Sequence, residues 1–296
     1  MFTVISTIAH SMPKWLPCAA IDEVRALAHH RGLFPPAGNT MQTINEYCDI
    51  ERGEHGIVRM FIRNAGPLNI LNSTVNRSLC EAFAKLATDR DIRVLVMAGT
   101  GIKSFIGGAD IKEMATLDQA SAETFIKGLR DVCEAVRAFP VPVIARLQGW
   151  CLGGGLEVAA ACDLRIASDD AKFAMPEVKV GIPSVIHAAL LPRLIGWGRA
   201  RWLILTAATI DAPTALSWGL VEQVVSTTDL DSAIAAAATA IAECAPQAIR
   251  NQKALLKQWE ELPLSQSVEI SVKAFGQAYL TGEPQRHMQA FLDRRK

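Results

Sequence analysis

The sequence predicts an α/β protein in which helices cover a sheet of largely parallel strands. Three observations lead to this prediction. The 296 residues are 50% hydrophobic and 20% charged, which suits a folded chain with a sizeable core. Short β-branched runs such as VLVMAG at 94–99 end in glycine and are typical of buried strands. Stretches with apolar residues at helical spacing alternate with these runs, and such alternation favours a parallel sheet.

The elements follow one another in a regular order. YCDIERG and GIVRMFI, at 47–53 and 56–62, predict a β-hairpin. A helix is expected over 73–89, with Asn72 or Ser73 as its N-cap. Strands are expected at 92–99, 141–149 and 164–168, and helices at 121–139 and 153–161. Residues 197–260 are predicted to be mostly helical, and AIAAAATAIAEC at 233–244 is the plainest case.

The first forty residues differ from the rest of the chain. Their periodicity is weak, and they end in the helix-breaking cluster GLFPPAGNT at 32–40. We expect residues 1–40 to be a disordered, dispensable N-terminal extension outside the main fold. An alternative is that Met41 is the functional start of the protein.

Charge and cysteine content exclude several classes of protein. Thirty basic residues balance thirty acidic ones, so no net field favours nucleic acid or an anionic membrane. Seven scattered cysteines form no CxxC pair, which indicates reduced thiols. No apolar run reaches the length of about 18 residues that spans a bilayer, and MFTVISTIAH is too short for a secretory signal. We therefore expect a cytoplasmic protein with no metal site and no nucleic-acid or membrane partner.

Two glycine-rich segments each follow a predicted strand. In IARLQGWCLGGGLEVAAACD, at 144–163, a strand leads into three glycines and then a helix. Free N–H groups and the dipole at a helix start bind oxyanions, although a tight turn with close packing is the alternative. VLVMAGTGIKSFIGGADIK, at 94–112, repeats the pattern but matches neither nucleotide-phosphate motif. Together, two such turns predict an oxyanion hole made of main-chain N–H groups.

Four segments resemble the crotonase superfamily, the enoyl-CoA hydratase/isomerase group: LNILN at 68–72, SFIGGADIKEM at 104–114, GWCLGGGLEVAAACDLRIAS at 149–168 and AKFAMPEVKVGIP at 171–183. The resemblance extends over about residues 45–225. It implies a crotonase-like spiral of ββα units over 41–236 and a helical C-terminal trimerisation region over 237–296. It also implies a homotrimer or homohexamer and an acyl-CoA substrate, with coenzyme A as part of the substrate and no other cofactor.

The resemblance assigns roles to individual residues. The oxyanion-hole N–H groups would belong to Ala109 and Gly154, and the catalytic acids would be Glu157 and Glu177. Glu157 lies about one helical turn after Gly154, which by itself places it near the predicted oxyanion site. The residues expected to contact substrate or CoA are Lys103, Ser104, Phe105, Gly108, Ala109, Asp110, Ile111, Lys112, Gly153, Gly154, Pro176, Ser184 and Ile186. For Lys103 and Lys112, a solvated surface role is the equal alternative.

The resemblance implies an enoyl-CoA hydratase of fatty acid metabolism, a lyase that adds water reversibly across the 2,3-double bond of an acyl-CoA thioester. Both acids are present, whereas double-bond isomerases of the family usually lack the one that matches Glu157. Other members of the superfamily remain alternatives: an isomerase, a hydrolase or C–C lyase, and a non-catalytic interaction or RNA-binding protein.

The segment after Glu177 departs from the family pattern. Many hydratases read GLIPGAGGTQRL there, and this chain reads GIPSVIHAALLPRL. We expect the bulkier Val185 and Ile186 to reshape or shorten the acyl pocket. His187 either lines that pocket or is a packed or capping residue. The departure leaves acyl chain length and reaction type open.

Overall fold

The computed structural model describes residues 41–293, and residues 1–40 lie outside this range. The main body holds two sheets. The larger has the order β1 (Gln42–Asn45), β2 (Cys48–Arg52), β3 (Ile57–Ile62), β4 (Val94–Gly99), β6 (Val143–Leu147), β8 (Leu164–Ser168) and β11 (Gln223–Val225). The smaller has the order β10 (Ile210–Asp211), β9 (Lys172–Ala174), β7 (Trp150–Leu152) and β5 (Ser104–Ile106).

The helices connect and cover these strands. Those of the main body are α3 (Ser73–Ala87), α4 (Ile111–Met114), α5 (Gln119–Ala138), α6 (Gly154–Ala161), α7 (Leu191–Ile195), α8 (Trp197–Thr206), α9 (Ala212–Trp218) and α10 (Leu230–Ala242). The C-terminal ones are α11 (Pro246–Glu261), α12 (Leu264–Ala278) and α13 (Glu283–Asp293). Short 3-10 turns are η1 (Glu54–Gly56), η2 (Glu177–Val180), η3 (Ile186–Leu190) and η4 (Tyr279–Thr281).

The predicted hairpin and parallel strands are confirmed. Strands β2 and β3 pair antiparallel, and β3, β4, β6, β8 and β11 then run parallel. The predicted cap is also present, because the Asn72 side chain accepts a hydrogen bond from the Val75 N–H at 2.8 Å. The mixed α/β architecture predicted from the alternation of strands and helices is therefore correct.

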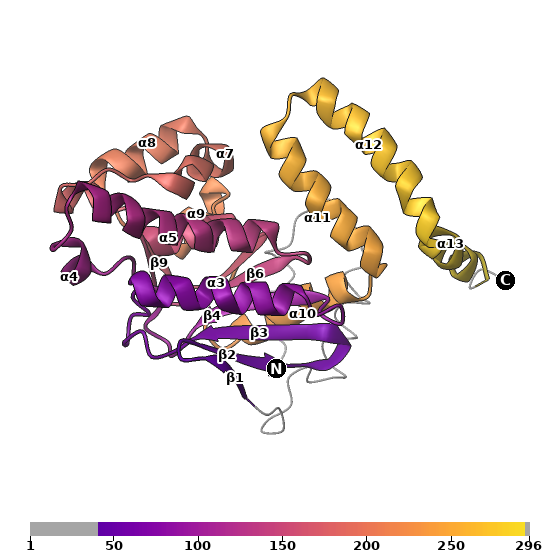
Figure 1. Ribbon diagram of the computed structural model, residues 1–296, viewed down its shortest axis with the longest axis horizontal. Helices are drawn as coiled ribbons and strands as arrows, with labels where there is room; N and C mark the ends of the chain where they lie inside the picture. Colours follow the sequence, from indigo (N-terminus) through magenta and orange to yellow (C-terminus); the bar gives the residue numbers. More distant parts are fainter. Residues whose placement is uncertain (1–40, 294–296) are drawn as a thin grey trace, which may run out of the picture.

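The large sheet is buried on both faces. Helices α3 and α5 lie side by side over one face, and α10 lies on the other (Figure 1). Strand β4 shows the alternation, since Leu95 and Met97 join the core under α3 and α5 while Val94 and Val96 pack toward α10. A strand covered on both faces must be apolar throughout, which is why its sequence lacks a polar period.

One arrangement differs from the sequence prediction. Neither glycine segment directly follows a strand of the large sheet. After β4 the chain first forms β5, and after β6 it first forms β7, and both belong to the small sheet. These strands have only three residues each, too few for a pattern of period two to stand out. The glycine segments therefore begin at the ends of neighbouring strands in the small sheet.

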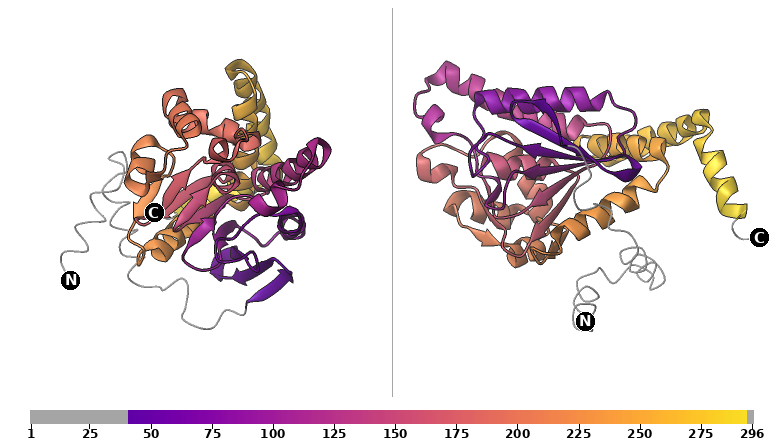
Figure 2. Two further views of the ribbon diagram at one scale, coloured as in Figure 1. Left: turned by 90° about the vertical axis from the view of Figure 1, so that its left-hand side faces the viewer. Right: turned by 90° about the horizontal axis from the view of Figure 1, so that it is seen from below.

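The C-terminal helices leave the main body. Helix α10 spans the expected division at 236/237 and packs beneath the large sheet, so the first helix that stands apart is α11 (Figure 1). Buried Lys253 anchors α11, because its Nζ donates to Asp163 Oδ2 at 2.7 Å and to the carbonyls of Val136 and Val141. Helices α12 and α13 extend farther from the body (Figure 2).

Among residues 41–293, no single helix is both long and apolar enough to cross a membrane. Helices α10 and α11 pass that length and composition test only as a pair, and they meet at a bend of 105°.

Candidate active site

The small sheet brings three predicted site residues to one edge. Strand β7 runs parallel to both β5 and β9, with Ile106 opposite Cys151 and Cys151 opposite Phe173. Ala109 and Gly154 each lie three residues beyond a paired residue, and Glu177 lies four beyond Phe173. Because parallel strands end at the same edge, the two glycine segments and the segment that carries Glu177 emerge together.

The three consecutive glycines have separate steric causes. Gly153 has a φ of +51°, and a Cβ there would lie 2.3 Å from Glu177 Oε1. A Cβ on Gly155 would lie 2.3 Å from the Ile106 carbonyl oxygen. At Gly154 it would lie 2.6 Å from a Leu129 methyl group. The triplet therefore lets the start of α6 approach β5, helix α5 and the Glu177 carboxylate at once.

The main-chain N–H groups of Ala109 and Gly154 lie at this edge. The Leu71 N–H donates to the Gly108 carbonyl and the Asp110 N–H donates to the Leu71 carbonyl, both at 2.9 Å, so the N–H between them, on Ala109, faces away from Leu71. Gly154 is the first residue of α6, and its N–H therefore has no partner within the helix. Within residues 41–293, neither of these N–H groups donates to a backbone carbonyl.

The loop around Gly108 lies against the end of β7. Gly108 has a φ of +107°, and a Cβ there would lie 3.2 Å from the Leu152 carbonyl oxygen. This close approach sets the Ala109 N–H beside the segment that begins α6 with Gly154. One N–H from each segment, with the positive end of α6 behind them, is a combination of donors that would suit an oxyanion.

Glu157 is the more buried of the two acids. Its exposed fraction is 3%, and its Oε1 accepts a hydrogen bond from the Ala188 N–H at 2.8 Å. Burial raises the pKa of Glu157 to about 8, although the Ala188 N–H opposes this shift and the charge of Glu177 adds to it. The carboxyl group therefore retains a proton readily near neutral pH.

Glu177 is half-buried at the start of η2. Burial raises the pKa of this carboxyl as well, and hydrogen bonds from its own N–H and from Ser184 act in the opposite direction. Ser184 Oγ donates to Glu177 Oε2 at 2.9 Å, while Oε1 lies against Gly153. The charge of Glu177 also raises the pKa of Glu157, but it contributes less than burial does.

The other predicted contact residues differ in the exposure of their side chains. Ile111 and Lys112 are exposed at the start of α4, immediately after Ala109, and Lys103 is exposed before β5. Ser104 and Phe105 have exposed fractions of 2% and 1%, which leaves only their backbone for contact with a ligand. The cause is the unpredicted strand β5, all three residues of which are buried.

Two of the predicted contact residues lie at the start of short helices. Asp110 caps α4 by accepting from the Lys112 N–H at 2.8 Å. Pro176 immediately precedes Glu177, at the N-cap position of η2.

The segment that departs from the family pattern contacts both acids, through the Ser184 side chain and the Ala188 N–H. Ile186 has a φ of +40°, a conformation that costs a β-branched residue about 1–3 kcal/mol. Its side chain packs at the edge of the core, while Val185 is exposed. His187 is 8% exposed and its Nε2 lies 2.9 Å from Glu134 Oε1 on α5. Sequence reasoning did not identify Ala188 or Glu134, because a backbone donor and a residue 53 positions away leave no local signal.

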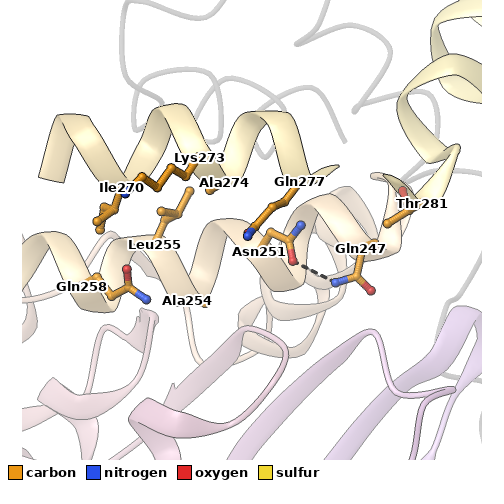
Figure 3. Close-up of a pocket in the computed structure, with 10 residues that line it drawn as sticks. All are labelled: Gln247, Asn251, Ala254, Leu255, Gln258, Ile270, Lys273, Ala274, Gln277 and Thr281. Atoms are coloured by element: carbon orange, nitrogen blue, oxygen red, sulfur yellow. Dashed lines mark hydrogen bonds between the residues drawn. The ribbon is translucent and has the colours of Figure 1, made fainter. Parts of the chain in front are cut away.

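Two further features bear on cofactors and ligands. Within residues 41–293, no group of three or more His, Cys, Asp or Glu side chains is placed to hold a metal ion. A cavity of about 440 Å³ lies between α11 and α12, with Leu255, Ile270 and Lys273 among its lining residues (Figure 3). Its lining includes neither acid and neither oxyanion-hole residue.

Comparison with known proteins identifies the family. The profile of the family described as enoyl-CoA hydratase/isomerase matches residues 52–296. The chain therefore belongs to this family.

Individual relatives of the chain carry names of the same family. The chain is 34% identical to the short-chain-enoyl-CoA hydratase of Clostridium acetobutylicum over 77% of its own length and 88% of the relative. It is also 34% identical to the crotonyl-CoA hydratase of Syntrophomonas wolfei, over 82% of this chain and 94% of the relative. The crystal structure of an enoyl-CoA hydratase from Mycobacterium smegmatis superposes with a TM-score of 0.81 at 29% identity, over 84% of this chain and 97% of that one. This structural match confirms the predicted crotonase-like fold.

Proposed function

We propose that the protein is a hydro-lyase that adds water reversibly across the 2,3-double bond of a 2-enoyl-CoA. The thioester oxygen would sit between the N–H groups of Ala109 and Gly154. As water adds at C3, negative charge moves onto this oxygen, and the two donors stabilise the resulting enolate. Loss of one such donor typically costs about 3–4 kcal/mol, or roughly 100- to 1000-fold in rate.

Glu157 and Glu177 supply the proton transfers. Hydration requires a base that removes a proton from water and an acid that delivers one to C2. Two carboxyls provide both groups at the same pH when one is a carboxylate and the other a carboxylic acid. The raised pKa of Glu157, about 8, keeps this singly protonated state populated near neutral pH.

The presence of both acids beside the oxyanion hole is the observation that carries the proposal. An isomerase needs one group to move a proton between two carbons, whereas hydration needs a water held by two. The hydratase names of relatives at 34% identity support the same choice.

A substrate screen tests this function. Purified protein mixed with 2-enoyl-CoA thioesters from C4 to C10, including branched and aromatic ones, should abolish the enoyl absorbance of at least one of them. Conversion of a 3-enoyl-CoA with no hydration of any 2-enoyl-CoA would instead establish the isomerase alternative.

We further propose that the protein acts as a homotrimer or a homohexamer. Helix α12 exposes Leu264, Val268, Val272 and Phe275 at helical spacing, which forms an apolar face that one subunit leaves uncovered. Light scattering of the protein and of a Val272→Asp variant would show whether this face holds subunits together. Action in the cytoplasm and independence of any cofactor stay predictions.

A further inference from the structure

The acid Glu157 depends on one backbone donor that lies in a strained segment. Its Oε1 accepts from the Ala188 N–H at 2.8 Å, two residues after Ile186 with its φ of +40°. A β-branched residue persists in that conformation only where the surrounding structure holds it. Other contacts in the fold must therefore hold η3 (Ile186–Leu190) in this conformation. His187 lies between Ile186 and Ala188.

That residue, His187, is fixed to a different element. Its Nε2 donates to Glu134 Oε1 on α5 at 2.9 Å. The second oxygen of Glu134 accepts from Lys257 Nζ of α11 at 3.3 Å, so the carboxylate is itself held in place. His187 Nδ1 is buried without a partner, which favours a neutral ring that carries its proton on Nε2. Burial lowers the pKa of His187, in agreement with a neutral ring.

We propose that His187 is a positioning residue: its hydrogen bond to Glu134 holds η3 in the strained conformation that presents the Ala188 N–H to Glu157. His187 touches neither reacting carboxyl in this arrangement. It acts through the backbone of the next residue, and Glu134 links α5 and α11 to the acid pair. The kinetic part of the test rests on the proposed function.

The charges around both ends of this link decide what its loss would do. Glu157 faces Glu177 and the Cys133 thiol, and His187 faces Glu134, Arg137 and Lys257. Near Glu157, the Ala188 N–H is thus the group that favours the charged form. If η3 relaxes and this donor moves away, the pKa of Glu157 should rise above its value of about 8.

Three variants separate positioning from simple packing. His187→Ala removes the donor, and Glu134→Ala removes its acceptor. His187→Gln keeps an N–H near the position of Nε2 and serves as the conservative rescue. Glu123→Ala is the matched control, since Glu123 lies on the same helix in an exposed pair with Lys127. Each is measured for hydration of a 2-enoyl-CoA and for the pH dependence of kcat.

His187→Ala and Glu134→Ala should each lower kcat at least tenfold, change KM less than about threefold, and shift the limb of the kcat profile that reports Glu157 upward by about one pH unit. His187→Gln and Glu123→Ala should stay within about threefold of the parent protein. Equal losses in His187→Gln and His187→Ala, full activity of Glu134→Ala, or a lower Tm with an unmoved pH profile would each overturn the proposal.

A second readout needs no activity. The Tm difference between each background and the same background with Glu157→Gln follows the protonation of Glu157 alone. Taken as the Tm with Glu157→Gln minus the Tm without it, this difference rises with pH until Glu157 has lost its proton. The rise should extend to higher pH in the His187→Ala background than in the parent, and an unchanged curve would refute the link. If the parent protein hydrates no enoyl-CoA, the proposed function fails, but this comparison still decides the role of His187.

Discussion

Replacing Gly153 by alanine should displace the Glu177 carboxylate, for which we propose a catalytic role. A Cβ at this position would lie 2.3 Å from Glu177 Oε1, where ordinary contact begins near 3.4 Å. The carboxylate is the end of a flexible side chain, so it can move by about 1 Å rather than force the backbone apart. A misplacement of that size costs about 100-fold in rate when the group transfers a proton.

The same substitution strains the backbone, because φ at Gly153 is +51°. With ψ at −122°, Gly153 also lies outside the left-handed helical region, so an L-residue there costs about 1–3 kcal/mol and should lower Tm by several degrees. Gly181 provides the matched control. It has a φ of +83°, ends η2, and has nothing within 4 Å of the position that an alanine methyl group would take. Gly181 has a ψ of +16° and lies in the left-handed helical region, so Gly181→Ala introduces milder backbone strain without displacing Glu177.

Steady-state hydration and thermal unfolding of both variants test the reasoning. We expect Gly153→Ala to lose more stability than Gly181→Ala and about 100-fold in kcat, and Gly181→Ala to keep a kcat within about threefold of the parent. Equal activity of the two variants would show that the position of the Glu177 carboxylate against Gly153 does not matter for catalysis.

Three other changes have expected outcomes. Glu157→Gln and Glu177→Gln should each lower kcat about 100-fold or more with little change in acyl-CoA affinity, and near-full activity of either would show that its acid is misassigned. Stability should depend on pH through Glu157: its folded pKa of about 8 exceeds the ordinary 4.5, so its contribution is complete below pH 4.5 and is lost as pH rises through 8. The Tm of Glu157→Gln relative to the parent should rise over that range, and a flat difference would contradict the burial argument. Ile186→Ala should favour longer acyl chains by about tenfold in kcat/KM across a C4 to C10 series, whereas a uniform drop would assign Ile186 to core packing.

Much of this architecture could be predicted because its signals are local. The buried strand β4 is apolar throughout and ends in glycine, and α3 begins with a capping asparagine. The small sheet could not be predicted in this way. Strands β5 and β7 have three residues each, and what makes them strands is pairing with each other rather than a pattern of their own. The resemblance named Ser104 and Phe105 as ligand contacts, and pairing in β5 buries both of their side chains.

The features of the site likewise divide into those with a local sequence signal and those that depend on distant contacts. Gly154 and Glu157 lie on one helix, so their spacing alone places them together. The steric reason for each glycine was not visible, because it lies in contacts with Glu177, Leu129 and the Ile106 carbonyl. The backbone donor of Ala188 carries no side-chain signature at all. His187 drew attention only as a departure from the family pattern, and its partner Glu134 became apparent from the packing of η3 on α5.

Hydration of crotonyl-CoA in D₂O tests the central claim most directly, because it reports the water addition and the proton delivery in one reaction. If the two carboxyls and the two N–H groups act as proposed, the enoyl absorbance falls and mass spectrometry finds one solvent deuteron at C2 of the 3-hydroxyacyl-CoA product. In Glu157→Gln and Glu177→Gln, the loss of enoyl absorbance and the incorporation of deuterium should slow together. Persistence of the enoyl band for crotonyl-CoA and for every longer 2-enoyl-CoA would contradict the account.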